Sequence, residues 1–361
     1  MQFNSLDEFL NGMKVISETN KIYIWGICVY GNLLGKLLNK NQISWNGYYD
    51  NFNSADKDQL NLKRVYKGDE VNHFEHAYYI LSMRNYEAVK KQLLSAGVDS
   101  EHIIFFDNVK ILDSIEERLD GCPASVGQLK RLNRVHSGER CFIIGNGPSL
   151  RVEDLDVIYH AKAASFACNR IFRCYDKSMW RPDYYFITDG VGIRETFPDK
   201  TVLDFVSQNC KYIFSRSNGD LAKYANDIDN LILFKYVFSD SEEEFDFSSD
   251  CAEKVYIGHT VTYVMLQMAV YMGFKEIYLL GMDHNFSIEH CENGEIAKNA
   301  EVEDHSSILG SYMWGVADGI KTTRTYEAAK KYADSHGIKI YNATRGGKLE
   351  VFERVDFDKL F

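Results

Sequence analysis

The chain has 361 residues, and aspartate and glutamate outnumber lysine and arginine to give a formal net charge of −11. Its content of 45% hydrophobic and 26% charged residues is ordinary for a folded protein and excludes disorder as the main state. The acidic balance argues against a nucleic-acid partner, because phosphate contacts need clustered lysine and arginine. At roughly 150 residues per domain, the length predicts two domains.

The eight cysteines are scattered along the chain without a CxxC pair. This pattern predicts neither a disulfide framework nor a structural zinc site, and we expect reduced thiols in a cytoplasmic protein. The first residues lack a basic stretch followed by an apolar one, and no later run reaches 18 apolar residues. We therefore expect no standard export signal and no transmembrane segment.

Residues 1–110 are predicted to form a small Rossmann-like domain with a parallel sheet, because strand and helix patterns alternate. Strands are expected at 22–25, 43–49, 78–83 and 103–106, and helices at 26–39 and 85–96. Gly26 and Gly31 match the first and third glycines of a GxGxxG fingerprint, and Asp50 follows the second strand. Cys28 replaces the glycine that makes room for pyrophosphate. This favours a structural or sugar-nucleotide-recognising module over one that binds NAD.

Residues 111–139 are predicted to be a helical connector, and 140–361 a second Rossmann-like domain. The fold class is therefore α/β, with two parallel-sheet domains. Strands of the second domain are expected at 141–144, 163–168, 182–189, 211–214, 231–237, 275–280 and 338–341, with helices at 258–272 and 325–336. The polar stretch 285–314 is expected to be irregular, and a structureless connection of this length in a compact domain is usually either an active-site lid or disordered.

The second domain opens with an apolar strand that runs into Gly145-Asn-Gly-Pro-Ser149. This pattern predicts a strand-loop-helix ligand cradle. Gly145 and Gly147 would let the backbone approach a ligand closely, and Asn146 can both donate and accept hydrogen bonds. Pro148 fits the first turn of a helix, where free amides can face an anion. The alternative is an ordinary glycine-rich turn between a strand and a helix.

Four polar side chains follow apolar strands in this domain: Asn146, Asn169, Asp189 and Asp283. Since the carboxyl ends of parallel strands share one edge, we expect them to converge on one crevice. The amides suit a nucleotide base, a ribose or a sugar. The carboxylates suit a hydroxyl, a general base or hydrated Mg²⁺. Alternatively, each residue caps a neighbouring helix.

The sequence resembles a known family in three segments: Ile143-Ile-Gly-Asn-Gly-Pro-Ser-Leu150, Ala167-Cys-Asn-Arg170, and the run from Tyr271 to Asp283 that ends in Leu-Gly-Met-Asp. These look like the signature of the MptE-like domain, which includes archaeal 6-hydroxymethylpterin pyrophosphokinase and bacterial motility accessory factor proteins. They are also similar to bacterial lipooligosaccharide sialyltransferases, which use a CMP-linked donor. The resemblance covers residues 140–348 and implies that Asn146 and Asn169 contact such a donor.

The leading hypothesis is a glycosyltransferase of surface-polysaccharide or glycoconjugate assembly that uses a nucleotide-activated, CMP-linked sugar and a glycan acceptor. His305, Asp189 or Asp283 would accept the acceptor proton. The amides of the helix that starts near Thr260 would face the departing phosphate. One alternative is a pyrophosphokinase-type enzyme with Mg²⁺ held by both aspartates, and another is a non-catalytic nucleotide-binding accessory protein. Peripheral association with membrane glycan machinery would fit the first hypothesis.

Overall fold

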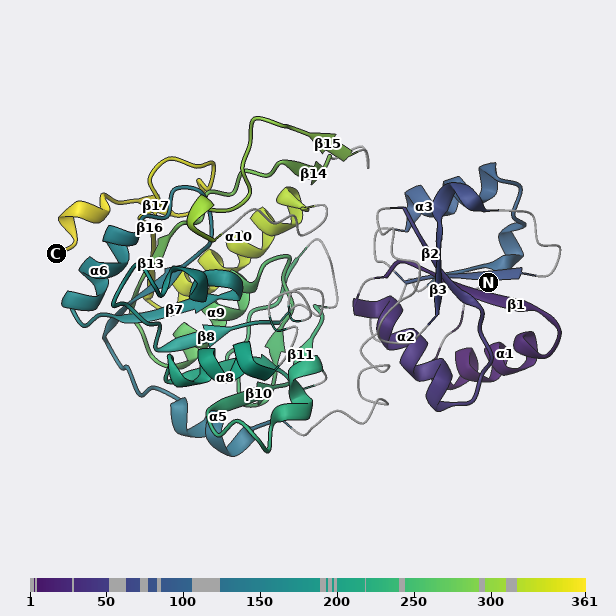
Figure 1. The fold of residues 1–361 in the computed structure, drawn as a ribbon, viewed down its shortest axis with the longest axis horizontal. Coiled ribbons are helices and arrows are strands. Elements are labelled where there is room, and N and C mark those ends of the chain that lie inside the picture. Colours follow the sequence, from purple (N-terminus) through teal and green to yellow (C-terminus); the bar gives the residue numbers. More distant parts are fainter. Residues whose placement is uncertain are drawn as a thin grey trace. The chain divides into compact units, whose positions relative to one another are not determined.

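A computed structural model describes residues 3, 5–27, 29–51, 63–71, 77–82, 86–105, 124–188, 193, 197, 200–217, 219–239, 244–291, 296–309 and 317–361. The chain divides into two compact units, Met1–Gly121 and Cys122–Phe361. In each unit a parallel sheet is flanked by helices, so the predicted α/β class is confirmed (Figure 1). Residues 111–123 of the predicted connector lie outside the described residues, and the helix α5 (Val126–Leu132) belongs to the second unit.

The first unit has a five-stranded sheet in the order β3-β2-β1-β4-β5, with every pairing parallel. Its elements are α1 (Leu6–Thr19), β1 (Lys21–Trp25), α2 (Val29–Lys40), β2 (Gly47–Asp50), β3 (Arg64–Lys67), β4 (Ala77–Leu81), α3 (Glu87–Ser95) and β5 (Ile103–Ile104). The sequence did not predict α1 or β3. The second strand starts at Gly47 rather than at residue 43, because the side chain of Asn46 instead accepts a hydrogen bond from Ile22 N (2.9 Å).

The fingerprint residues of the first unit serve its own turn. The Asp50 carboxylate accepts a hydrogen bond from Ile27 N (2.8 Å), directly after β1. A side chain at Gly31 would collide with the carbonyl oxygen of Gly26, so this glycine allows α2 to pack close to the end of β1. Cys28 lies outside the described residues, and the expectation that this unit binds no NAD stays a prediction.

The second unit has an eight-stranded parallel sheet in the order β10-β9-β8-β7-β6-β13-β16-β17. These strands are β6 (Arg140–Ile144), β7 (Ala164–Cys168), β8 (Tyr184–Phe186), β9 (Tyr212–Arg216), β10 (Leu231–Phe234), β13 (Glu276–Leu280), β16 (Lys339–Asn342) and β17 (Glu353–Arg354). The chain builds outward from β6 to β10 and then returns to place β13 on the other side of β6. Strand order therefore reverses between β6 and β13, which is where open α/β sheets bind ligands.

Helices cover both faces of this sheet. One face carries α5, α9 (Val261–Tyr271) and α10 (Gly319–Ser335), and the other carries α6 (Val152–His160) and α8 (Lys200–Gln208). The helix predicted at 258–272 is confirmed as α9, with Thr260 as its N-cap. Nearly all of its residues are buried, as its continuous apolar sequence requires. The last helix starts at Gly319, six residues before the predicted start, because the Asp318 side chain caps it by accepting from Lys321 N (2.9 Å).

Two other predictions need correction. The strand predicted at 231–237 is split into β10 and the short β11 (Tyr236–Val237), which pairs with β12 (Val255–Tyr256) instead of continuing in the main sheet. The stretch predicted to be irregular contains an antiparallel hairpin, in which β14 (Ile288–His290) pairs with β15 (Ile296–Lys298). The sequence signal for this hairpin was weak, because its strands are short and mostly polar.

A buried ion pair ties the C-terminal segment to α6. Asp154, whose side chain is 6% exposed, pairs with Arg345, which also contacts Asp358 at 2.5 Å. Burial raises the pKa of Asp154, while the hydrogen bond and charge of Arg345 lower it. The arginine therefore compensates a carboxylate that has lost most of its water.

We expect Arg345→Met to destabilise the second unit by about 2 kcal/mol, because it leaves Asp154 buried without its cation. Urea unfolding would measure this change. Lys330→Met is the control, because the Lys330–Asp334 pair is exposed and should contribute well under about 1 kcal/mol. If the two substitutions destabilised the protein equally, the buried Arg345–Asp154 ion pair would not have the stabilising role given to it here.

Candidate functional site

The loops that follow β6 and β13 lie directly against each other. Gly145 N donates to the carbonyl of Leu280 (2.8 Å), and Gly147 N donates to that of Gly281 (3.0 Å). A side chain at Gly145 would come within 2.6 Å of Met282 Sδ, and one at Gly147 would overlap the Asp283 carboxylate. The two glycines are thus required for this loop-to-loop packing, and their predicted close approach to a ligand stays a prediction.

Asp283 holds the turn of the first loop. Its carboxylate accepts from the Ser149 hydroxyl (2.8 Å) and from Ser149 N (3.3 and 3.4 Å). Burial raises the pKa of Asp283, and the bonds from Ser149 oppose this shift. Pro148 lies in this turn, and the helix α6 begins only at Val152. The expectation that Pro148 starts a helix is wrong, because the Ser149 amide is held by Asp283 instead of entering a helical turn.

Asn146 connects β6 to the end of β7. Its side-chain amide donates to the carbonyl of Cys168 (3.2 Å), the residue before Asn169. Its own backbone carbonyl accepts from Ser306 N (2.8 Å). The side-chain oxygen Oδ1 is buried and has no hydrogen-bond partner among the described residues. Since a buried acceptor without a donor is costly, this oxygen is a candidate to receive a hydrogen bond from a ligand.

Hydrogen bonds hold the segment around His305 against the loops at the carboxyl ends of the strands. The Asp304 carboxylate accepts from Ser287 N (2.6 Å) and from the Ser287 hydroxyl (2.5 Å). On the other side of His305, Ser306 bonds to Asn146, and the carbonyl of Leu309 accepts from Arg173 (3.3 Å). His305 is therefore held between the loops that follow β6, β7 and β13.

The environment of His305 favours its neutral form. Burial lowers its pKa, and the positive charge of Arg170 lowers it further, while Asp304 acts in the opposite direction. Nε2 of His305 is buried and makes no hydrogen bond within the described part of the chain. A neutral imidazole with a free nitrogen can accept a proton from a bound hydroxyl.

The other predicted residues are placed less completely. Asn169 has a positive φ of 53°, and its carbonyl accepts a hydrogen bond from the Tyr185 hydroxyl. Thr260 caps α9 by accepting from Thr262 N (3.3 Å), and Thr262 in turn contacts Met282 Sδ (3.4 Å), beside Asp283. Asp189 lies outside the described residues.

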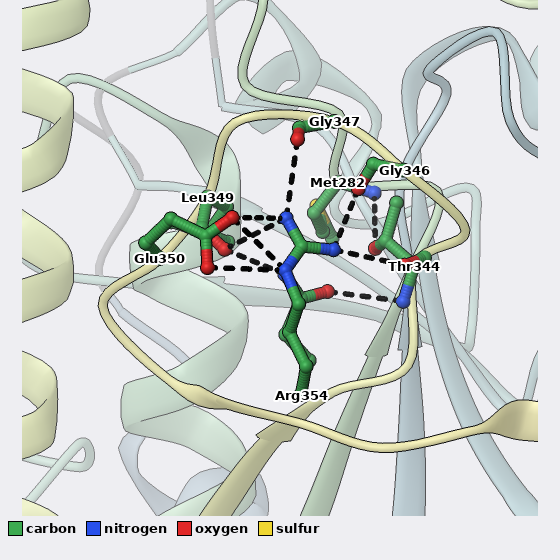
Figure 2. Close-up of polar contacts among 8 residues, drawn as sticks. Met282, Thr344, Gly346, Gly347, Leu349, Glu350 and Arg354 are labelled. Atoms are coloured by element: carbon green, nitrogen blue, oxygen red, sulfur yellow. Dashed lines mark hydrogen bonds and ion pairs between the residues drawn. The ribbon is translucent and has the colours of Figure 1, made fainter.

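Figure 2 shows a C-terminal loop that is ordered around Arg354 and that contacts Met282, the residue before Asp283. Arg354 donates to the carbonyls of Thr344, Gly346, Gly347 and Leu349 at 2.7–3.4 Å, and to the Glu350 carboxylate at 2.6–3.1 Å. The ordered loop then presents the Thr344 hydroxyl to Met282 N (3.0 Å) and Lys348 N to the Asp283 carbonyl (2.7 Å). Arg354 thus orders the loop that binds the backbone before and after the Asp283 side chain, at Met282 N and at the Asp283 carbonyl.

Sequence reasoning did not single out three residues near this edge: Arg170, His284 and Arg216. Arg170 is buried and lies close enough to His305 to lower its pKa. His284 bonds to the Thr323 hydroxyl (2.8 Å), and burial lowers its pKa. Arg170 and His284 directly follow predicted site residues in the sequence, and this adjacency could have identified them as candidates.

Within the described ranges, no group of three or more histidine, cysteine or acidic side chains is arranged to hold a metal ion. The six cysteines that the structure describes are free: Cys141, Cys168, Cys174, Cys210, Cys251 and Cys291. Of the helices in the described part of the chain, none combines the length and apolar character needed to cross a membrane.

Fold and geometry together define the second unit as a Rossmann-like α/β domain with a polar cluster at its strand-order switch point. The family model described as "6-hydroxymethylpterin diphosphokinase MptE-like" matches residues 116–289, which confirms the resemblance to this family over that segment. The model "C2185-like, N-terminal" matches residues 18–104.

Two solved structures are similar to the chain at low identity. The MAf glycosyltransferase from Magnetospirillum magneticum AMB-1 is 14% identical with a TM-score of 0.38, over 99% of this chain and 62% of that one. The chain thus spans less than two thirds of that protein. The sialyltransferase CstII from Campylobacter jejuni, solved with cytidine-5'-monophosphate, is 15% identical with a TM-score of 0.32, over 61% of this chain and 85% of that one. A search of curated proteins gave no match.

Replacing glycine by alanine should have opposite effects on stability at a packed position and at an open one. Gly147→Ala should destabilise the second unit by about 2 kcal/mol, because the methyl group overlaps the Asp283 carboxylate. Gly127→Ala is the matched control on α5, where an added methyl group meets nothing within 4 Å and should stabilise by about 0.5 kcal/mol. Urea unfolding of both variants measures the difference. A Gly147→Ala variant as stable as the original protein would contradict the packing role.

The lowered pKa of His305 predicts a loss of stability on acidification. Below the ordinary value of 6.5, the unfolded chain takes up a proton that folded His305 resists, so stability falls as the pH decreases through this range. We expect the urea midpoint to drop less between about pH 7.5 and pH 5.5 in His305→Gln than in the original protein. His284 contributes in the same direction in both proteins, so the comparison isolates His305. An equal drop in both would contradict the prediction.

Proposed function

We propose that the second unit is a glycosyltransferase that transfers a sugar from a nucleotide-activated, CMP-linked donor to a glycan acceptor. The proposal rests on two buried atoms, in neighbouring segments, that make no hydrogen bond within the described residues. Asn146 Oδ1 offers an acceptor, and His305 Nε2 offers a base. The Ser306–Asn146 hydrogen bond brings their segments together at the switch point of the sheet.

In this proposal, Asn146 and Asn169 hold the nucleotide, and Gly145, Gly147 and Ser149 shape the loop that presents Asn146. The acceptor hydroxyl attacks the anomeric carbon, the bond from that carbon to the phosphate oxygen breaks, and the hydroxyl proton passes to Nε2 of His305. The amides at the start of α9, next to Thr260, would stabilise the phosphate that leaves. Burial and Arg170 favour this role, because both keep His305 neutral and able to accept a proton.

The two aspartates have smaller roles in this proposal. Asp283 already accepts two donors from Ser149, so it is better suited to positioning the Asn146 loop than to accepting a proton. Asp189, which follows β8 in the sequence, would orient the acceptor hydroxyl. We further propose that the enzyme works in the cytoplasm with reduced thiols, at the periphery of membrane glycan assembly.

A Mg²⁺-dependent pyrophosphokinase is the second candidate, favoured by the description of the matching family model. It would need Asp189 and Asp283 to hold the metal between phosphates, which competes with the contacts between Asp283 and Ser149. A third candidate, a non-catalytic accessory protein, would bind nucleotide at Asn146 but transfer nothing.

We expect Asn146→Ala to weaken CMP binding about tenfold, or about 1.4 kcal/mol, because the ligand donor then loses its buried acceptor. Calorimetry with and without EDTA measures this, and EDTA should leave the affinity unchanged. Asn209→Ala is the control, since Asn209 lies at the end of α8 and bonds to Phe205 and Arg181, away from the site.

Two other outcomes discriminate between the candidates. An affinity that collapses in EDTA yet tolerates Asn146→Ala would sink the glycosyltransferase proposal and support the pyrophosphokinase. Tight CMP binding without release of CMP from CMP-sugar donors in the presence of glycan acceptors would support the accessory protein.

A further inference from the structure

His284 follows the loop residue Asp283 and reaches across to the first turns of α10. Its Nε2 lies 2.8 Å from the hydroxyl oxygen of Thr323. The same hydroxyl donates its hydrogen to the carbonyl of Gly319, also at 2.8 Å. Because a threonine hydroxyl has one hydrogen to donate, its oxygen acts as an acceptor toward His284. Nε2 of His284 therefore carries the ring N–H.

The bond to Thr323 leaves the other ring nitrogen of His284 as an acceptor. Burial lowers the pKa of His284, which favours the neutral ring. A neutral imidazole has one N–H, so with the hydrogen on Nε2 the lone pair lies on Nδ1. Within the described ranges, no hydrogen-bond donor contacts Nδ1. Nδ1 can therefore accept a hydrogen bond from a bound group.

The backbone of His284 is held in an uncommon conformation. Its φ is +50°, in the left-handed region that residues with a Cβ atom rarely adopt. The carbonyl of the preceding residue, Asp283, accepts a hydrogen bond from Lys348 N (2.7 Å), while the imidazole is fixed by Thr323. Such conformations persist where the surrounding structure imposes them, and they concentrate at binding and active sites.

Two further side chains meet at the start of α10. The ring of Phe286 lies 5.4 Å from that of His284, in an edge-to-face arrangement. A side chain at Gly319 would come within 2.9 Å of Glu289 Oε2 and 3.4 Å of Phe286 Cε2, so both groups lie against this glycine. We call these three side chains, His284, Phe286 and Glu289, the His284 cluster.

The His284 cluster is connected to the candidate site at both ends of its segment. Asp283, at one end, bonds to the Ser149 hydroxyl (2.8 Å) in the loop that carries the nucleotide-binding candidate. Ser287, at the other end, bonds to Asp304, the residue before the candidate base. The first two members of the cluster lie between these two anchors. The cluster therefore belongs to the same loops that form the candidate site.

The chemistry of the cluster suits a neutral sugar better than a phosphate. The Nδ1 lone pair and the Glu289 carboxylate accept hydrogen bonds, and sugar hydroxyls donate them. The Phe286 ring offers an apolar surface to the C–H face of a sugar ring. The phosphodiester of a nucleotide-linked sugar has no hydrogen to donate, and the Glu289 carboxylate would repel its charge.

We propose that the His284 cluster is a subsite for the acceptor and binds a neutral sugar ring through its hydroxyl groups. Nδ1 of His284 accepts a hydrogen bond from one of these hydroxyls, and Thr323 is the residue that positions the imidazole. This rests on the proposed function, because it describes the acceptor side of the transfer and leaves the nucleotide at Asn146.

The tautomer of His284 can be measured directly. In the full chain with isotope-labelled histidine, long-range proton–nitrogen NMR distinguishes a protonated ring nitrogen from an unprotonated one, and His284→Gln identifies the signal. We expect the hydrogen on Nε2 in the original protein and in Thr323→Ser, and a loss of this preference in Thr323→Val. A hydrogen on Nδ1 in the original protein, or an unchanged tautomer in Thr323→Val, would overturn the proposal.

Binding of neutral glycosides tests the subsite itself. The probes are methyl β-D-glucopyranoside and methyl β-D-galactopyranoside. Their fully O-methylated forms are the controls, because they keep the ring but have no hydrogen to donate. In ligand-observed NMR titrations we expect at least one free glycoside to bind, and neither O-methylated form.

Two substitutions separate the acceptor role of Nδ1 from the presence of a polar side chain. The dissociation constant of the bound glycoside should rise about tenfold in His284→Gln, which lacks an acceptor at the Nδ1 position. It should change less than about threefold in His284→Asn, whose side-chain oxygen can take the place of Nδ1. His160→Gln is the matched control and should behave as the original protein, because His160 is exposed at the end of α6.

Several outcomes would overturn the subsite. They are equal dissociation constants in the original protein and His284→Gln, binding of an O-methylated form, or no binding of either free glycoside. Should His284→Gln not fold, Gly319→Ala takes its place, since alanine is favourable in a helix and its methyl group would displace the Glu289 carboxylate. This variant should raise the dissociation constant about fivefold, and an unchanged value would overturn the proposal.

Nucleotide binding separates this proposal from the proposed function. His284→Gln should keep its affinity for CMP, whereas Asn146→Ala should lose it. A loss of CMP affinity with unchanged glycoside binding in His284→Gln would overturn the acceptor assignment and place the nucleotide at His284. If CMP does not bind at all but glycoside binding still depends on His284, the sugar subsite stands and the CMP-linked donor fails.

Discussion

The close contact between the β6 and β13 loops is the constraint on which the candidate site depends. Strand order reverses between these strands, so their loops diverge to serve opposite halves of the sheet. They can touch only because Gly145 and Gly147 have no side chains and Asp283 bonds to Ser149. The polar cluster is thus a consequence of how two backbone segments pack. This contact fixes the position of each side chain in the cluster.

Two further segments stabilise this contact from opposite sides. The Arg354 loop binds Met282 N (Figure 2) and the Asp283 carbonyl, and the Asp304 segment brings His305 close to Asn146. Both segments come late in the chain, while Asn146 comes at the start of the unit. The site therefore forms only when the first and last segments of the unit have come together. The position of His305 consequently depends on the folding of the C-terminal loop.

Local patterns were enough to predict the α/β class, most strands, and the position of Asn146, Asn169 and Asp283 after strands. Such patterns report burial and periodicity, which α9 and β6 show clearly. They do not report pairing between distant segments. The capture of Ser149 by Asp283 and the strand β3 depend on partners elsewhere in the chain, whereas the Asp318 cap of α10 is a local contact with Lys321. Arg216 was missed because the strand was predicted to end at the apolar Phe214, two residues before the charge.

Hydrogen bonds distinguish His136 from His305. His136 lies at the amino end of the sheet, stacks on Phe274, and uses both ring nitrogens, on Glu139 (2.8 Å) and on the Tyr184 hydroxyl (2.6 Å). It has no nitrogen left for a substrate, and it joins the residues just before β6 and just after α9 to the start of β8. His305 sits at the carboxyl end with Nε2 buried and unbonded among the described residues. Because folding normally satisfies buried polar atoms, this unbonded nitrogen near Asn146 is the feature on which the proposed role of His305 as a base rests.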